Sequence, residues 1–93
     1  MQLSAEVTVE PFVAGRRGPH VEAVGSAARR CGALVEVGPF GDRIEGDEGV
    51  LSEAMAAAVR DAFAAGATRL TVQVTAVVAT AGAPSADISL NRG

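Results

Sequence analysis

The sequence contains no tryptophan, tyrosine or lysine, and it has only one cysteine, one histidine and three phenylalanines. Its 8 basic residues, all arginines, face 11 acidic residues, so the formal net charge is -3 and the pI about 5.0. A nucleic-acid-binding surface normally needs clustered positive charge and, for single strands, aromatic side chains on which bases stack. The composition therefore argues against a nucleic-acid partner.

Cysteine and long apolar runs are also scarce. Because Cys31 is the only cysteine, the chain cannot form an internal disulfide and lacks the thiol set of a structural zinc site. No run approaches the roughly 18 to 20 apolar residues of a membrane span, and Met1–Glu6 do not resemble a secretory signal. These features predict a reducing compartment, cytoplasmic localisation and no membrane insertion.

The length sets the domain organisation. At 93 residues and 48% hydrophobic composition, the chain can bury one core. Residues 1–79 are expected to form one domain, and residues 80–93 a tail that is flexible or contacts a partner. A domain of this size hides only about 60 to 65% of its unfolded surface, so stabilisation by homo-oligomerisation is expected.

Hydrophobic periodicity predicts six elements. The predicted strands, which alternate with period two, cover residues 3–10, 33–39, 42–46 and 68–78. The predicted helices run from Pro19 to about Cys31 and from Val50 to about Ala65, with Asp47 as a candidate N-cap of the second. This order indicates an α+β, ferredoxin-like βαββαβ fold, in which a four-stranded antiparallel sheet carries two helices on one face.

The alternation also divides side chains between the two sheet faces. Val7, Val35, Ile44 and Val72 should face the helices. The helix-free face should carry hydroxyls, an amide, three carboxylates and one arginine, namely Ser4, Glu6, Thr8, Glu36, Arg43, Glu45, Thr71, Gln73 and Thr75. This mixture of donors and acceptors suits a small polar ligand, the alternative being an ordinary solvated or sheet-packing surface.

No catalytic motif is present. His20 follows Pro19 without a recognisable nucleophile, and Cys31 lies on the apolar stripe of the first predicted helix. The glycine-rich turns match neither a phosphate loop nor a dinucleotide fingerprint. We therefore expect a non-enzymatic protein with no metal site and no cofactor. Arg16 and Arg17 are expected to be surface charges, or to lie over a ligand's phosphate.

Two segments carry a family resemblance. They are Ala5-Glu6-Val7-Thr8-Val9-Glu10-Pro11 and the turn Val37-Gly38-Pro39-Phe40-Gly41 followed by Asp42-Arg43-Ile44-Glu45-Gly46-Asp47. Both resemble the YkoF-like thiamine-binding domain family, as does Ala65-Gly66-Ala67-Thr68-Arg69, so the resemblance spans about residues 3–76. It implies a ferredoxin-like fold, assembly into dimers or higher oligomers, and binding of thiamine or its hydroxymethylpyrimidine moiety. Asp42 departs from the family pattern, which more often has a hydroxyl residue there, and this leaves the ligand open.

The chemistry of thiamine suits the helix-free face. Thiamine has a positively charged thiazolium ring, which carboxylates could neutralise, and an aminopyrimidine edge that hydroxyl and amide groups could read. Phe40 is either a wall of the site or a core residue. The candidate ligand-binding residues are Glu6, Thr8, Glu36, Gly38, Phe40, Gly41, Asp42, Arg43, Glu45 and Gln73.

Three functional hypotheses follow. The preferred one is a protein that binds thiamine or a related pyrimidine in vitamin B1 salvage, transport or sensing. The alternative is an oligomeric interaction module with no small ligand. A small enzyme on a dimeric α+β barrel would need a buried histidine or tyrosine, and the chain has no tyrosine. Outward-facing Leu34 and Val77 predict a homodimer, or a dimer of dimers, in which two sheets face each other.

Overall fold

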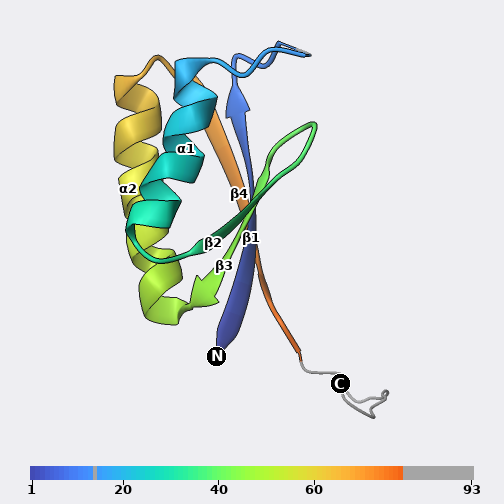
Figure 1. Cartoon of the computed structure of the whole chain (residues 1–93), viewed down its shortest axis with the longest axis vertical. Helices are drawn as coiled ribbons and strands as arrows, with labels where there is room; N and C mark the ends of the chain where they lie inside the picture. The colour runs from blue at the N-terminus through green and yellow to red at the C-terminus, as the bar shows by residue number, and fades with distance from the viewer. Residues whose placement is uncertain (14, 79–93) are drawn as a thin grey trace.

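The computed structural model describes residues 1–13 and 15–78. Its elements are β1 (Gln2–Glu10), α1 (Pro19–Arg30), β2 (Leu34–Val37), β3 (Asp42–Asp47), α2 (Glu48–Ala64) and β4 (Arg69–Ala76). The strands form one antiparallel sheet in the order β2-β3-β1-β4, and both helices cover the same face (Figure 1). This arrangement confirms the predicted ferredoxin-like fold. The expected tail, residues 80–93, lies outside the described residues.

The helix ends follow local sequence chemistry. Pro19 occupies the start of α1, where its missing N–H has no partner to lose. Asp47 caps α2, because its Oδ1 accepts a hydrogen bond from the backbone N–H of Val50 at 2.8 Å. Gly32 and Gly66 follow the two helices with φ of +90° and +110°, in the left-handed region that glycine adopts readily.

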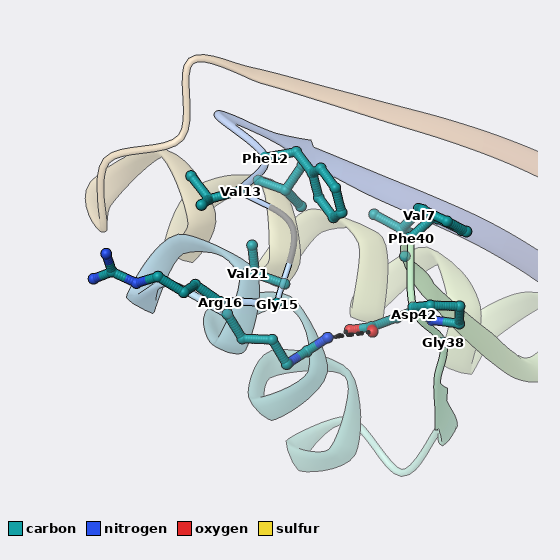
Figure 2. A pocket seen from close by; sticks show the side chains of 13 residues that line it. Val7, Phe12, Val13, Gly15, Arg16, Val21, Gly38, Phe40 and Asp42 are labelled. Carbon is teal, nitrogen blue, oxygen red and sulfur yellow. Dashed lines mark hydrogen bonds and ion pairs between the residues drawn. The ribbon is translucent and has the colours of Figure 1, made fainter.

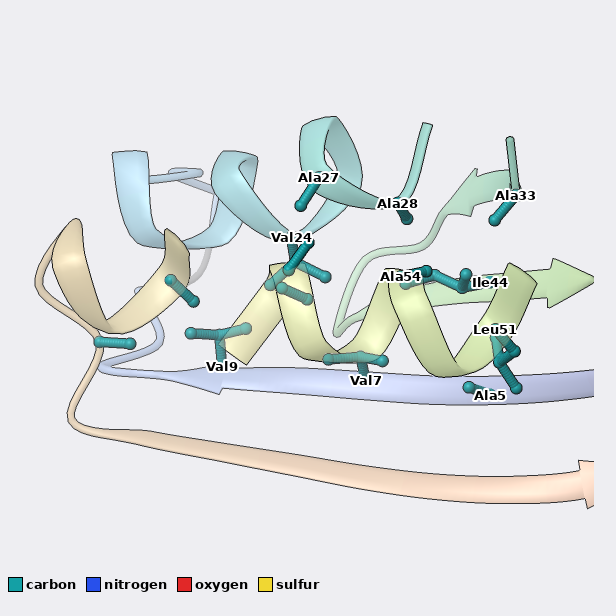
Figure 3. Close-up of a cluster of buried hydrophobic side chains, with 14 residues drawn as sticks. Ala5, Val7, Val9, Val24, Ala27, Ala28, Ala33, Ile44, Leu51 and Ala54 are labelled. Atoms are coloured by element: carbon teal, nitrogen blue, oxygen red, sulfur yellow. The ribbon is translucent and has the colours of Figure 1, made fainter. Parts of the chain in front are cut away.

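Alternation predicted the sheet faces correctly. Val7 and Ile44 are buried under the helices, and Val35 and Val72 lie half-buried on the same side. The core also contains small helix residues that allow close approach to the sheet, as Figure 3 shows for Ala27, Ala28 and Ala54. Cys31 is half-buried and packs against this core. The opposite, helix-free face is called the open face below. It carries the side chains of Glu6 and Arg43, which lie opposite each other on β1 and β3.

One ion pair joins the two helices across their exposed edge. Arg30 of α1 donates from Nη2 to Asp61 Oδ2 of α2 at 2.5 Å.

Within the described residues, no helix is both long and apolar enough to cross a bilayer.

Candidate functional site

The turn between β2 and β3 is the centre of the candidate site. It spans residues 38–41, and the N–H of Gly38 donates to the carbonyl of Gly41 at 2.8 Å. A Cβ on Gly41 would lie 2.5 Å from the carbonyl oxygen of Val7, so only glycine lets the turn pack this closely on β1. Phe40, at the tip, is 72% exposed and is therefore not a core residue.

Two depressions border this turn, one on each side of the sheet. The first, called the open-face hollow, has a volume of about 530 Å³. It is lined by Glu6, Val7, Thr8, Glu36, Val37, Gly38, Pro39, Phe40, Gly41, Asp42, Arg43, Thr71 and Gln73. Every residue that the sequence predicted for the site borders this hollow, except Glu45.

The open-face hollow carries excess negative charge. The strand register places Glu6 between Arg43 of β3 and Gln73 of β4. Arg43 Nη1 lies 3.8 Å from an oxygen of Glu36 and 3.8 Å from one of Glu45, which is too long for a hydrogen bond. No ion pair joins Glu6 to another described residue. Three carboxylates on this face thus share one guanidinium.

The second depression, called the helix-side cavity, has a volume of about 250 Å³ and lies between the sheet, α1 and the β1–α1 loop (Figure 2). Its walls are mainly apolar, formed by Val7, Val9, Val21, Pro39 and the two rings of Phe12 and Phe40. The ring centroids of Phe12 and Phe40 are 6.0 Å apart, tilted by 43°. This is a normal geometry for an aromatic pair.

A buried carboxylate lies in the helix-side cavity. The Asp42 side chain is only 2% exposed, and its two oxygens face Arg17 Nη1 and Nη2 at 3.3 and 3.4 Å. The Nε of Arg17 donates to Glu22 Oε2 at 2.7 Å. Hydrogen bonds from Arg17 to Glu22, and then to Asp42, raise the pKa of Arg17 above its usual range, so the guanidinium stays charged.

The structure places two residues, Asp42 and Arg17, differently from what the sequence predicted. The carboxylate of Asp42 faces the helix side rather than the open face, because Asp42 lies two residues before Ile44 in β3 and residues two apart in a strand point to the same face. Arg17 is not a simple surface charge but the ion-pair partner of this buried group. Sequence reasoning missed the helix-side cavity, although the spacing of Asp42 from Ile44 was the signal that could have revealed a buried carboxylate.

The single histidine makes a contact between two elements, and the described acidic groups form no metal site. His20 lies with Nε2 2.6 Å from the carbonyl oxygen of Pro11, which ties the start of α1 to the end of β1. Across residues 1–13 and 15–78, no group of three or more His, Cys, Asp or Glu side chains is placed to hold a metal ion.

Comparison with known proteins gives the fold. No protein-family model and no curated protein matches the sequence. Among solved structures, a Streptococcus pneumoniae protein aligns with a TM-score of 0.63 and 23% identity. The alignment covers 87% of this chain and 90% of the Streptococcus protein. A hypothetical protein from Methanocaldococcus aligns with a TM-score of 0.60 and 19% identity, covering 78% and 75%. A domain of unknown function, DUF77, from Bacillus cereus aligns with a TM-score of 0.58 and 21% identity, covering 80% and 72%. At these identities the similarity shows a shared fold and no more.

Proposed function

We propose that the protein binds a small nitrogen heterocycle, either the cation thiamine or its hydroxymethylpyrimidine moiety, in the open-face hollow without catalysing a reaction. The observation that carries this proposal is the excess of carboxylates around a hollow that also contains hydroxyl and amide groups and an exposed aromatic ring. The resemblance of residues 3–76 to the YkoF-like family adds support.

Each part of the hollow has a role in this proposal. Glu6 and Glu36 neutralise the cationic ring, and the exposed ring of Phe40 packs against it. Thr8 and Gln73 supply donors and acceptors to the aminopyrimidine edge.

The other predicted site residues act around these contacts. The backbone of Gly38 and Gly41 shapes the rim of the hollow. Arg43 lies near both Glu36 and Glu45, and its positive charge offsets the repulsion between the two carboxylates. The corresponding cellular role is vitamin B1 salvage, transport or sensing in the cytoplasm.

Thermal melting with and without ligand tests the proposal. Thiamine at 100 times its dissociation constant should add about 2.7 kcal/mol of stability, because it binds the folded state alone. Hydroxymethylpyrimidine should give a smaller shift, since it lacks the cationic ring. If millimolar thiamine leaves the melting temperature unchanged, the proposal is wrong.

A second candidate is an interaction module whose open face packs on another copy without a ligand. Leu34 is 69% exposed and Val77 45% exposed, and both are apolar groups that a partner would cover. This candidate predicts association of the chain with no effect of thiamine on melting.

A further inference from the structure

Within the part of the chain that the structure describes, the helix-side cavity contains a buried charge whose hydrogen-bonding capacity is not filled. An ionised carboxylate has about four acceptor positions, and burial makes each unfilled one costly. Among the described residues, Arg17 is the only group that hydrogen-bonds the Asp42 side chain. Its contacts of 3.3 and 3.4 Å are longer than the usual N–H···O range. Asp42 can therefore accept stronger hydrogen bonds than it has.

Arg17 is anchored elsewhere and can leave Asp42 without losing all its partners. The contact of its Nε with Glu22, at 2.7 Å, is much shorter than either contact with Asp42. The side chain is 31% exposed and comes from the loop between β1 and α1. If Arg17 stays with Glu22 and leaves Asp42, the buried carboxylate of Asp42 loses its paired charge, and a cation that takes the place of Arg17 restores the pairing.

The geometry of the contact defines the chemistry that could replace Arg17. Two guanidinium nitrogens face two carboxylate oxygens, which is the arrangement of a two-pronged hydrogen bond. A competing ligand must present two parallel N–H groups and a positive charge. Its body must fit the apolar walls formed by Val9, Val21 and the Phe12–Phe40 pair.

We propose that the helix-side cavity binds a small planar cation of the amidine or guanidine class, whose two N–H groups replace those of Arg17 on Asp42. Arg17 then remains with Glu22, and the ligand's flat body lies between the valines and the aromatic rings. This site lies on the other side of the β2–β3 turn from the open-face hollow and shares the turn residues 38–41 with it, but its charged groups, Asp42 and Arg17, are not those proposed to bind thiamine.

Titration calorimetry of the full chain with benzamidine tests the proposal, with benzamide as a neutral ligand of nearly the same shape. The unmodified chain should bind benzamidine and not benzamide. Asp42→Asn should abolish benzamidine binding, because the charge that holds the amidinium is lost. Arg17→Gln should strengthen binding by about tenfold or more, since it removes the competing guanidinium.

Arg16→Gln is the matched control. Arg16 borders the same cavity, and its substitution removes the same charge. No ion pair joins Arg16 to another described residue. It should change benzamidine affinity much less than Arg17→Gln does. If Arg17→Gln is unfolded alone, because Asp42 is left unpaired, benzamidine but not benzamide should restore its folded circular dichroism spectrum.

Three results would overturn the proposal. They are equal binding of benzamide and benzamidine, retained binding by Asp42→Asn, and equal effects of Arg17→Gln and Arg16→Gln. Glu6→Gln, on the open face, should leave benzamidine affinity unchanged, so failure at this site and failure of thiamine binding are distinguishable.

Discussion

At the residue scale, Asp61 carries the clearest pH dependence. A hydrogen bond from Arg30, and a second from Arg60, lower the pKa of Asp61 below its usual value. Since the pKa is lower in the folded state, this contribution to stability is complete above the unfolded pKa of about 3.9 and is lost as the pH falls through the folded value.

Asp61→Asn should therefore lower the melting temperature at pH 7, because the neutral amide loses the charge-assisted contact between the helices. The difference in melting temperature between this variant and the unmodified chain should shrink as the pH falls below the usual pKa of aspartate. Melting curves at about pH 7 and about pH 2 measure both. A deficit of the same size at both pH values would mean that the charge of Asp61 contributes nothing.

Single residues also show where sequence reasoning about the site stops. Alternation along a strand fixes the side of the sheet to which Glu6 or Gln73 points, so the residues of the open-face hollow were predictable. The same rule places Asp42 on the helix side with Ile44. The partner of Asp42 was not predictable, because Arg17 reaches it from a loop whose path depends on tertiary packing rather than on a repeating pattern.

At the element scale, the N-cap of α2 makes a measurable contribution to the free energy of unfolding. Asp47→Ala removes the side-chain oxygen that accepts the N–H of Val50, and should cost about 1 kcal/mol of unfolding free energy. Asp47→Asn retains an acceptor at the same position and should restore most of the loss. Urea denaturation followed by circular dichroism compares the two, and equal stability of Asp47→Ala and the unmodified chain would contradict the capping role.

The elements themselves were largely predictable, and their ends were less so. Strong period-two alternation identified all four strands, and apolar spacing identified both helices. The second helix begins at Glu48 rather than Val50, because the cap residue Asp47 directly precedes the first helical turn. The last strand ends at Ala76 instead of residue 78. Its pairing with β1 ends where Ala76 lies opposite Leu3, and the only further bond between them runs from the N–H of Val77 to the carbonyl of Gln2 among the described residues.

At the scale of the whole molecule, the exposed apolar groups of the open face lead to a prediction about assembly. We predict a homodimer, or a dimer of dimers, in which two open faces meet and enclose pockets lined by Glu6, Thr8, Glu36 and Gln73. Covering Leu34 and Val77 favours this contact, whereas the excess carboxylates on each face oppose it.

Because the opposing term is repulsion between like charges, added salt or a cationic ligand should strengthen association. Light scattering at micromolar concentration, with and without thiamine and at two salt concentrations, measures this. A mass near 9.3 kDa under all these conditions would show that the open face stays unpaired.

The most direct test of the central claim is titration calorimetry of thiamine into the full chain and its Glu6→Gln variant. Glu53→Gln on α2, an exposed residue that lines neither depression, is the matched control for loss of one negative charge. Thiamine should bind the unmodified chain and the control equally. Glu6→Gln should weaken binding by about 1.5 to 3 kcal/mol, or roughly ten- to a hundredfold, because a charge-assisted contact is lost. Equal affinity of all three proteins, or no binding to any of them, would contradict the assignment of the open-face hollow to a cationic heterocycle.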